Sequence, residues 1–155
     1  MSGQGMKRFK TLMLAWAACA CLAAGAVQAQ GVQQNKELVL SFFRLMFQEH
    51  RVEEAVSRYV DKRYVQHDPY LESGTAPLRD FFTLYFEQNP QASADIKRVI
   101  AEGDLVVVHS LWKEAAEDRG QAVVDIFRVA EGKIVEHWGV SQEIPENPAN
   151  ANGMF

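Results

Sequence analysis

The fold is decided by the stretch Gln121-Ala122-Val123-Val124-Asp125-Ile126-Phe127-Arg128-Val129, which is followed by Ala130-Glu131-Gly132-Lys133 and a second run from Ile134 to Val140. Both runs are rich in β-branched and aromatic residues, and the glycine between them is placed for a tight turn. The pattern predicts two antiparallel strands joined as a hairpin.

One acid interrupts the first of these strands. Asp125 lies at its centre among apolar neighbours, and an unpaired buried carboxylate is costly. Strand alternation puts Val123, Asp125 and Phe127 on one face. Two interpretations stay open. Asp125 either pairs with an arginine at the rim of a sheet, or it faces a cavity in which a carboxylate takes up and releases protons.

The residues before this hairpin predict three helices and further strands. Apolar residues recur at helical spacing over 36–49, where Gln34 or Asn35 would cap the helix, over 52–59, and from a cap at Thr75 to a stop at Asn89. Strands are predicted at 65–68, 96–101 and 105–112. Helices followed by an antiparallel meander are typical of an α+β domain.

The first 29 residues have the pattern of a secretory signal peptide. Basic residues precede an apolar run from Leu12 to Val27, and Val27-Gln28-Ala29 suits cleavage after Ala29. An uncleaved membrane anchor is the alternative, because the run is near the lower limit for spanning. We expect export, to the periplasm, of a single domain formed by residues 30–155. Both cysteines lie in the signal segment, so the exported chain would have none.

The charge and the spacing of metal-binding residues exclude several classes of function. The formal net charge is −4, and loss of the basic signal segment would make it more negative. This argues against nucleic acid and against an anionic membrane as partners. No His-x-His or His-Glu-x-x-His spacing occurs, so no metal site is expected.

Four stretches, taken in order, resemble the SnoaL-like polyketide cyclase family of the nuclear transport factor 2-like superfamily. They are Tyr64-Val65-Gln66-His67-Asp68-Pro69, Gly103-Asp104-Leu105-Val106-Val107-Val108-His109, Val124-Asp125-Ile126-Phe127-Arg128 and Gly132-Lys133-Ile134-Val135-Glu136-His137-Trp138. The resemblance implies a conical barrel, in which three N-terminal helices pack on a strongly curved antiparallel sheet around an apolar pocket. It also implies acid/base chemistry by an aspartate, without metal or cofactor. Two positions depart from the family pattern: Asp68 replaces a common Asn, and Gly139 replaces a common Asp.

Residues and resemblance together give a set of expected site residues. Asp125 would take the proton, His67 would polarise a carbonyl, and His109 would be a second proton carrier. A purely structural role is the alternative for both histidines. The expected pocket wall comprises Tyr64, Phe82, Trp112, Phe127, His137 and Trp138. His137 and Trp138 point to opposite faces of one strand, and the sequence leaves open which of them lines the pocket.

The sequence therefore predicts a cofactor-independent enzyme acting on a small apolar carbonyl compound by aldol condensation, cyclisation or isomerisation. The alternative is a non-catalytic small-molecule-binding module of the periplasm or cell exterior, which Gly139 favours. Epoxide hydrolysis is a third possibility. Asp125 is expected to be the single pocket carboxylate, unless the face of Trp138 lines the cavity and makes Glu136 a second acid. A homodimer is expected, because the outer face of a curved sheet with alternating apolar residues needs covering.

Overall fold

The computed structural model describes residues 28–155. Its helical part comprises a first helix (residues 28–43), the π-helical turn η1 (Arg44–Gln48), helix α2 (Val52–Tyr59) and helix α3 (Thr75–Gln88). Strand β1 (Val60–Gln66) lies between α2 and α3, and the rest of the chain forms β2 (Ser93–Glu102), β3 (Leu105–Lys113), β4 (Gln121–Ala130) and β5 (Lys133–Glu143). The α+β prediction is confirmed. Of the expected signal peptide, residues 1–27 lie outside the described residues.

The sheet has five strands in the order β1-β5-β4-β3-β2. Strands β2 to β5 form the predicted antiparallel meander, whereas β1 joins β5 in parallel. The sheet is therefore mixed and open, which corrects the expectation of a wholly antiparallel barrel. The parallel pairing is possible because α3 and three strands separate β1 from β5 along the chain, and a parallel neighbour needs such a long connection.

The first helix begins earlier than predicted. Residues 28–35 are already helical, although we expected a start at Lys36. Asn35 does not cap the helix, because its side-chain amide donates to the carbonyl of Gly103 at 3.1 Å. Thr75 is likewise not a cap: Gly74, with a φ of 105°, precedes helix α3 without a side-chain cap bond. Polar residues at these positions favour capping by their type, but tertiary contacts decide their role.

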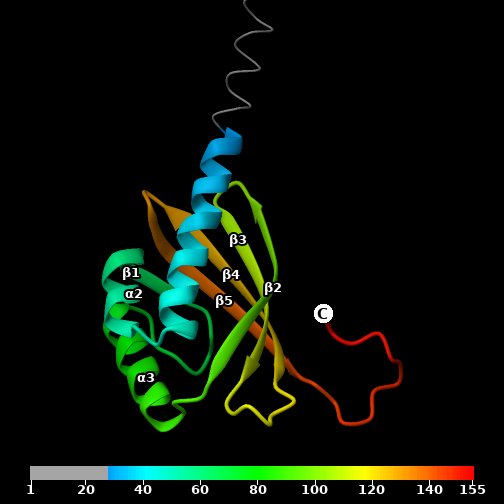
Figure 1. The fold of residues 1–155 in the computed structure, drawn as a ribbon. Coiled ribbons are helices and arrows are strands. Elements are labelled where there is room, and N and C mark those ends of the chain that lie inside the picture. Colours follow the sequence, from blue (N-terminus) through cyan, green and yellow to red (C-terminus); the bar gives the residue numbers. More distant parts are fainter. Residues whose placement is uncertain (1–27) are drawn as a thin grey trace, which may run out of the picture.

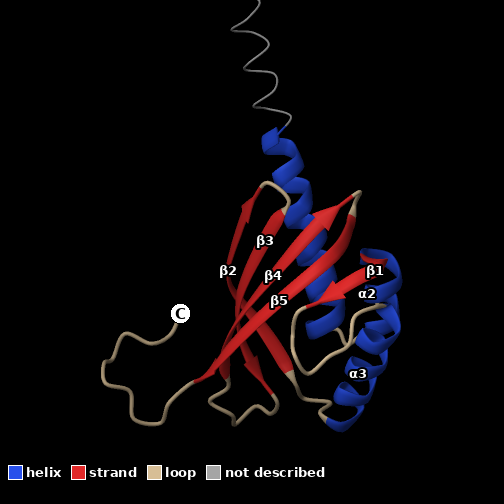
Figure 2. Cartoon of the chain, turned by 180° about the vertical axis from the view of Figure 1, so that it is seen from behind, coloured by secondary structure: helices blue, strands red, loops and turns tan. Residues whose placement is uncertain are grey.

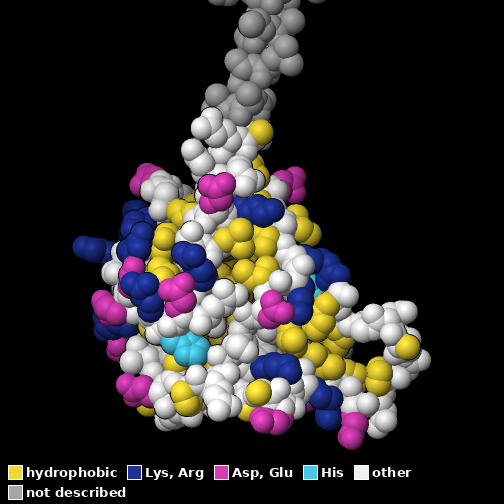
Figure 3. Space-filling view, viewed as in Figure 1, with side chains coloured by type: hydrophobic (Ala, Val, Ile, Leu, Met, Phe, Trp, Pro, Cys, Tyr) yellow, Lys and Arg dark blue, Asp and Glu magenta, His cyan; other side chains and the backbone are white. Residues whose placement is uncertain are grey.

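The helices cover one face of the sheet, as Figure 1 shows, and we call this the inner face. The buried core lies between the two layers and includes Val39, Phe42, Phe43 and Met46 from the helical side and Val106, Val108, Phe127 and Ile134 from the sheet. The opposite, outer face is turned to the viewer in Figure 2, where no helix crosses it. Charged side chains gather over α2 and β1 in Figure 3. No helix within residues 28–155 is long and apolar enough to cross a membrane.

Candidate active site

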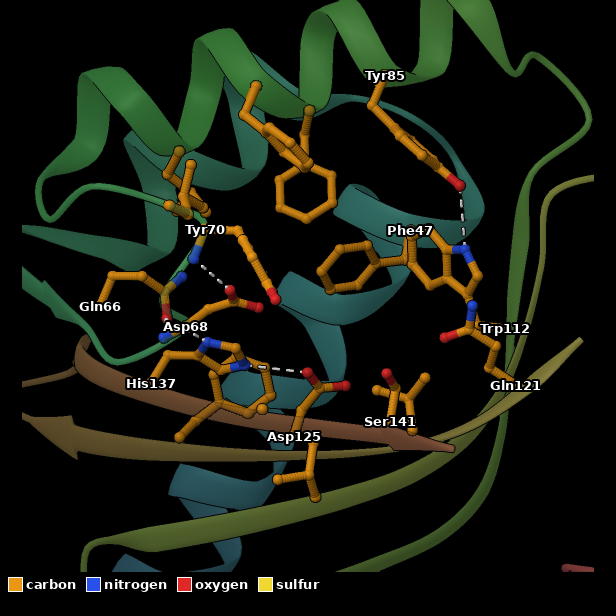
Figure 4. Close-up of a pocket in the computed structure, with 18 of the residues that line it drawn as sticks. Phe47, Gln66, Asp68, Tyr70, Tyr85, Trp112, Gln121, Asp125, His137 and Ser141 are labelled. Carbon is orange, nitrogen blue, oxygen red and sulfur yellow. Dashed lines mark hydrogen bonds and ion pairs between the residues drawn. The ribbon is translucent and has the colours of Figure 1, made fainter. Parts of the chain in front are cut away.

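A cavity of about 360 Å³ opens between the inner face of the sheet and helix α3 (Figure 4). Its volume suits a small organic molecule. Nine of its lining residues are aromatic, namely Phe42, Phe47, Tyr64, Tyr70, Phe81, Phe82, Tyr85, Trp112 and Phe127. Its polar side chains are Gln66, Asp68, Glu114, Gln121, Asp125, His137 and Ser141. The pocket is thus a largely apolar space with a few polar groups.

Asp125 faces this pocket and pairs with His137. Strand alternation on β4 places Val123, Asp125 and Phe127 on the inner face, and His137 lies opposite Phe127 on β5. The Nε2 atom of His137 is 3.0 Å from Oδ1 of Asp125, and the two side chains are only 13% and 14% exposed. Asp125 therefore faces a cavity, and its partner is a histidine inside the pocket and not an arginine at the rim of the sheet.

Gln66 holds the other side of the His137 ring. Its Oε1 atom lies 2.8 Å from Nδ1 of His137. The same oxygen accepts the backbone N–H groups of His67 at 3.0 Å and Asp68 at 3.1 Å. The amide nitrogen of Gln66 donates to the hydroxyl of Tyr64 at 3.0 Å. One hydrogen-bonded chain therefore runs from Asp125 through His137 and Gln66 to Tyr64.

Tyr64 ends this chain as a neutral phenol. The side chain is 3% exposed, and burial raises the pKa of Tyr64 far above its ordinary value, with the charges of Asp125 and Asp68 adding to the effect. Its oxygen accepts the hydrogen bond from Gln66, and its own proton has no acceptor within residues 28–155. A ligand in the pocket can therefore accept this proton in a hydrogen bond.

Two further carboxylates line the pocket, so the expectation that Asp125 is the single one is wrong. Asp68 accepts the backbone N–H of Tyr70 at 2.9 Å, at one end of the cavity. At the other end Glu114 lies 3.4 Å from the hydroxyl of Tyr85, which itself accepts the indole N–H of Trp112 at 3.1 Å. Burial raises the pKa of Tyr85 above its ordinary value, so this hydroxyl also stays protonated.

Gly139 leaves room beside the buried pair. It lies directly opposite Asp125 in the ladder between β4 and β5. A Cβ atom at this position would lie 3.3 Å from Cε1 of His137 and 3.8 Å from Oδ1 of Asp125. The first distance is tighter than ordinary carbon contacts, so a side chain here would press on the imidazole ring.

The structure places His67 and Trp138 on the outer face, away from the pocket. Nε2 of His67 is 2.8 Å from Oε1 of Glu136, and its ring stacks on Trp138 with a centroid distance of 4.7 Å. Glu136 and Trp138 alternate with His137 along β5, so they share the opposite face. His137 is therefore the residue of this strand that lines the pocket.

His109 also lies on the outer face. A guanidinium nitrogen of Arg98 donates to its Nδ1 at 2.8 Å, and Phe155 packs against the ring at 5.2 Å between centroids. The pocket thus brings together six of the expected residues, which are Asp125, Tyr64, Phe82, Trp112, Phe127 and His137. It does not include His67, His109 or Trp138.

Sequence reasoning did not single out Gln66, Asp68 or Glu114 as pocket residues. A signal for Gln66 was present, because it lies two residues after Tyr64 in a strand and must share its face. Glu114 follows the end of β3 in an irregular loop, where no periodicity places it. Among residues 28–155, no group of three or more His, Cys, Asp or Glu side chains is arranged to hold a metal ion.

Comparison with known proteins gives a family and a set of similar folds. The model of the SnoaL-like domain family matches residues 39–137, which is more than half of the chain and includes Gln66, Asp125 and His137. No curated protein matches the chain.

Three solved structures illustrate the likeness of fold. A candidate polyketide cyclase from Acidithiobacillus ferrooxidans is 21% identical, with a TM-score of 0.58, over 70% of this chain and 87% of that one. A candidate ketosteroid isomerase from Kribbella flavida is 16% identical, with a TM-score of 0.62, over 77% of this chain and 85% of that one. A candidate SnoaL-like polyketide cyclase from Jannaschia is 23% identical, with a TM-score of 0.57, over 71% and 86%.

Proposed function

The chain belongs to the SnoaL-like domain family, and from this premise we propose that it is a cofactor-independent enzyme that moves protons on a small carbonyl compound. The reaction would be a cyclisation, an isomerisation or an aldol-type condensation. One observation carries the proposal: a carboxylate and an imidazole lie 3.0 Å apart in a largely apolar pocket. Such pairs are suited to general acid/base catalysis.

Asp125 is the proton-transfer group in this proposal. Its Oδ2 atom makes no hydrogen bond within the described chain and is free for a substrate. Oδ2 takes a proton from the carbon next to the carbonyl, and the C–H electron pair forms the enolate. The enolate oxygen accepts the Tyr64 hydroxyl proton in a hydrogen bond. The proton on Asp125 then returns to another carbon in an isomerisation, or to the alkoxide formed when the enolate attacks a second carbonyl.

The pocket favours a substrate without a negatively charged group. No Lys or Arg is among its lining residues, whereas Asp68 and Glu114 line its two ends. Neither of these carboxylates forms an ion pair within residues 28–155. A substrate carboxylate or phosphate would be repelled, while a hydroxyl or amine at the far end could donate to Glu114. We therefore propose a neutral or cationic carbonyl compound with an apolar ring or chain.

The experiment is a hydrogen–deuterium exchange assay. The full chain is incubated in D2O with cyclohexanone, 2-cyclohexenone and 2-tetralone, and loss of the α-proton signals is followed by NMR. We expect faster exchange than in buffer for at least one compound. Asp125→Asn should lower the protein-dependent rate by roughly 10²-fold or more, because it removes the base.

Asp95→Asn is the matched control, because Asp95 lies on β2 in an exposed pair with Lys97 and does not line the pocket. Its exchange rate should equal that of the unmodified protein. Equal exchange rates in the Asp125→Asn variant and the unmodified protein would contradict the proposal.

The second candidate is a non-catalytic binding module. The aromatic side chains that line the pocket favour it, because such a wall binds apolar molecules whether or not chemistry follows. Native mass spectrometry after mild purification separates the two candidates. A bound, chemically unchanged molecule together with no exchange in any of the three ketones would support the binding module over the enzyme.

We further propose a homodimer that forms through the outer face of the sheet. Ile100 on β2 and Val140 on β5 are 63% and 68% exposed, although both are apolar. Covering such side chains favours association. Sedimentation velocity should give a dimer mass, and Ile100→Lys, at a residue that does not line the pocket, should shift the protein toward the monomer.

Export to the periplasm is also a proposal and rests on the residue pattern of positions 1–29. N-terminal sequencing of the protein from a periplasmic fraction should start at Gln30. A chain that keeps residues 1–29 would contradict cleavage.

A further inference from the structure

Gln66 determines which nitrogen of His137 carries a proton. Two backbone N–H groups, those of His67 and Asp68, donate to the Gln66 side chain at 3.0 and 3.1 Å. Only the oxygen of an amide accepts such bonds, so the atom that faces them is Oε1. This orientation also lets the amide nitrogen donate to Tyr64 at 3.0 Å. The backbone therefore fixes the side chain of Gln66 in one orientation.

The fixed oxygen dictates the protonation of the ring. Oε1 of Gln66 lies 2.8 Å from Nδ1 of His137, and a carbonyl oxygen cannot donate. Nδ1 must therefore carry a proton. A neutral ring then has a bare Nε2, and this nitrogen faces Oδ1 of Asp125 at 3.0 Å. Two lone pairs at that distance repel each other, so a further proton must lie between Nε2 and Oδ1.

We infer that Gln66 is a positioning residue that gives the Asp125–His137 pair no net charge at rest. The pair is either a carboxylic acid beside a neutral imidazole or a carboxylate beside an imidazolium, and both forms are neutral overall. With a bare Nδ1, the ring would donate from Nε2 to an ionised carboxylate, and the pair would carry one negative charge. The hydrogen bond from His137 to Gln66 excludes that arrangement.

The neutral pair has a consequence for the proposed reaction, on which this part of the inference rests. When the shared proton lies on Nε2 of His137, Oδ2 of the Asp125 carboxylate takes a proton from the substrate. The pair then becomes positively charged while the substrate becomes a negative enolate. Opposite charges then develop side by side in a pocket where both groups are largely shielded from water. A pair that started with a negative charge would end neutral and would not stabilise the enolate in this way.

The test is the protonation of His137, read from its ring nitrogens by two-bond proton–nitrogen correlation NMR on the full chain. The chain has four histidines, and the His137→Asn variant identifies the signals of His137. We expect a protonated Nδ1 near neutral pH in the unmodified protein, with Nε2 either protonated or hydrogen-bonded. A neutral ring with an unprotonated Nδ1 and a protonated Nε2 in the unmodified protein would overturn the inference, whatever the Gln66 variants show.

Two substitutions at Gln66 extend the test. Gln66→Met removes the acceptor at nearly constant volume and should switch His137 to the tautomer with a bare Nδ1. Gln66→Glu keeps an accepting oxygen and should retain the protonated Nδ1. An unchanged tautomer in a folded Gln66→Met variant would overturn the inference. If Gln66→Met does not fold, the protonation of Nδ1 in the unmodified protein and in Gln66→Glu still tests the inference.

The result separates this inference from the proposed enzyme activity. Exchange of ketone protons should fall roughly tenfold in Gln66→Met and remain measurable in Gln66→Glu. A protonated Nδ1 without exchange in any ketone would contradict the enzyme proposal and leave the role of Gln66 intact. Ketone exchange by a protein whose His137 has an unprotonated Nδ1 would contradict the role of Gln66 and leave the enzyme proposal intact.

Discussion

The two faces of the sheet hold the same chemical pair in different surroundings. On the inner face His137 lies 3.0 Å from Asp125, and on the outer face His67 lies 2.8 Å from Glu136. The inner side chains are 13% and 14% exposed, and the outer ones 40% and 24%. Glu136 and His137 are consecutive on β5, so strand alternation alone sends one pair inward and the other outward.

The difference lies in which oxygens remain free. Both oxygens of Glu136 are used, one by His67 and the other by Arg128 at 2.8 Å. Asp125 uses only Oδ1, and its second oxygen is open to the pocket. A histidine and a carboxylate at hydrogen-bond distance are therefore insufficient evidence for catalysis. A free oxygen, a cavity and shielding from water distinguish the inner pair.

The largest expected effect in this comparison comes from the phenol beside the inner pair. Tyr64→Phe removes the hydrogen bond to the enolate oxygen and should slow ketone exchange by roughly 10²-fold. The fold should persist, because the buried aromatic ring is retained. Tyr59→Phe is the control, since Tyr59 does not line the pocket, and its exchange rate should not change. Equal rates for the two variants would remove Tyr64 from the mechanism.

A side chain at position 139 should disturb the inner pair by contact alone. Gly139→Ala places a methyl group 3.3 Å from Cε1 of His137 and should lower the exchange rate by roughly tenfold, because small displacements of catalytic groups are costly. The melting temperature should change little, since the methyl group points into the pocket. An exchange rate equal to that of the unmodified protein would contradict this prediction and show that the His137 ring tolerates the displacement.

The acidic ends of the pocket should discriminate between substrates. We expect 4-oxocyclohexanecarboxylate to exchange several-fold more slowly than cyclohexanone, because Asp68 and Glu114 repel its carboxylate. Glu114→Gln should narrow this difference. Glu117→Gln is the matched control, as it lies in the same loop without lining the pocket. If the two ketones react equally, the charge of the pocket does not select the substrate.

The smallest effect is expected at the outer pair and concerns stability. The hydrogen bond from His67, followed by that from Arg128, holds the pKa of Glu136 below its ordinary value of 4.5. A carboxyl group with a lowered folded pKa stabilises the fold at higher pH and loses this contribution as the pH falls through that pKa. Glu136→Gln should therefore be slightly less stable than the unmodified protein at pH 7 and equally stable at pH 2. Urea unfolding at both pH values measures this. A stability difference between Glu136→Gln and the unmodified protein that is larger at pH 2 than at pH 7 would contradict this prediction.

Much of the fold could be predicted because the strands carry strong local signals. The expected helix over 52–59 coincides with α2, and the last two predicted strands lie within β4 and β5. The parallel pairing of β1 with β5 could not be predicted, since nothing local to 65–68 indicates a partner some seventy residues later. The predicted helix starts at Asn35 and Thr75 are wrong, because neither side chain caps a helix.

The candidate site was predictable only in part. Burial cost identified Asp125, and strand periodicity reduced the choice on β5 to His137 or Trp138. The sequence could not decide between the two, because β5 carries apolar residues on both of its faces. The pocket face is the one that the helices cover, and the position of the helices is known only from the structure. The position of His67, directly after the strand that carries Tyr64 and Gln66, favours a place in the pocket. Its ring instead stacks on Trp138 at the outer face.

The central claim is that the inner pair, and not the outer one, transfers protons. The most direct measurement is the ketone exchange rate of two histidine variants under identical conditions. His137→Gln should lower the rate by roughly 10²-fold, because Asp125 loses its partner, while His67→Gln should leave it unchanged. Equal rates in both variants, or a loss confined to His67→Gln, would contradict the account.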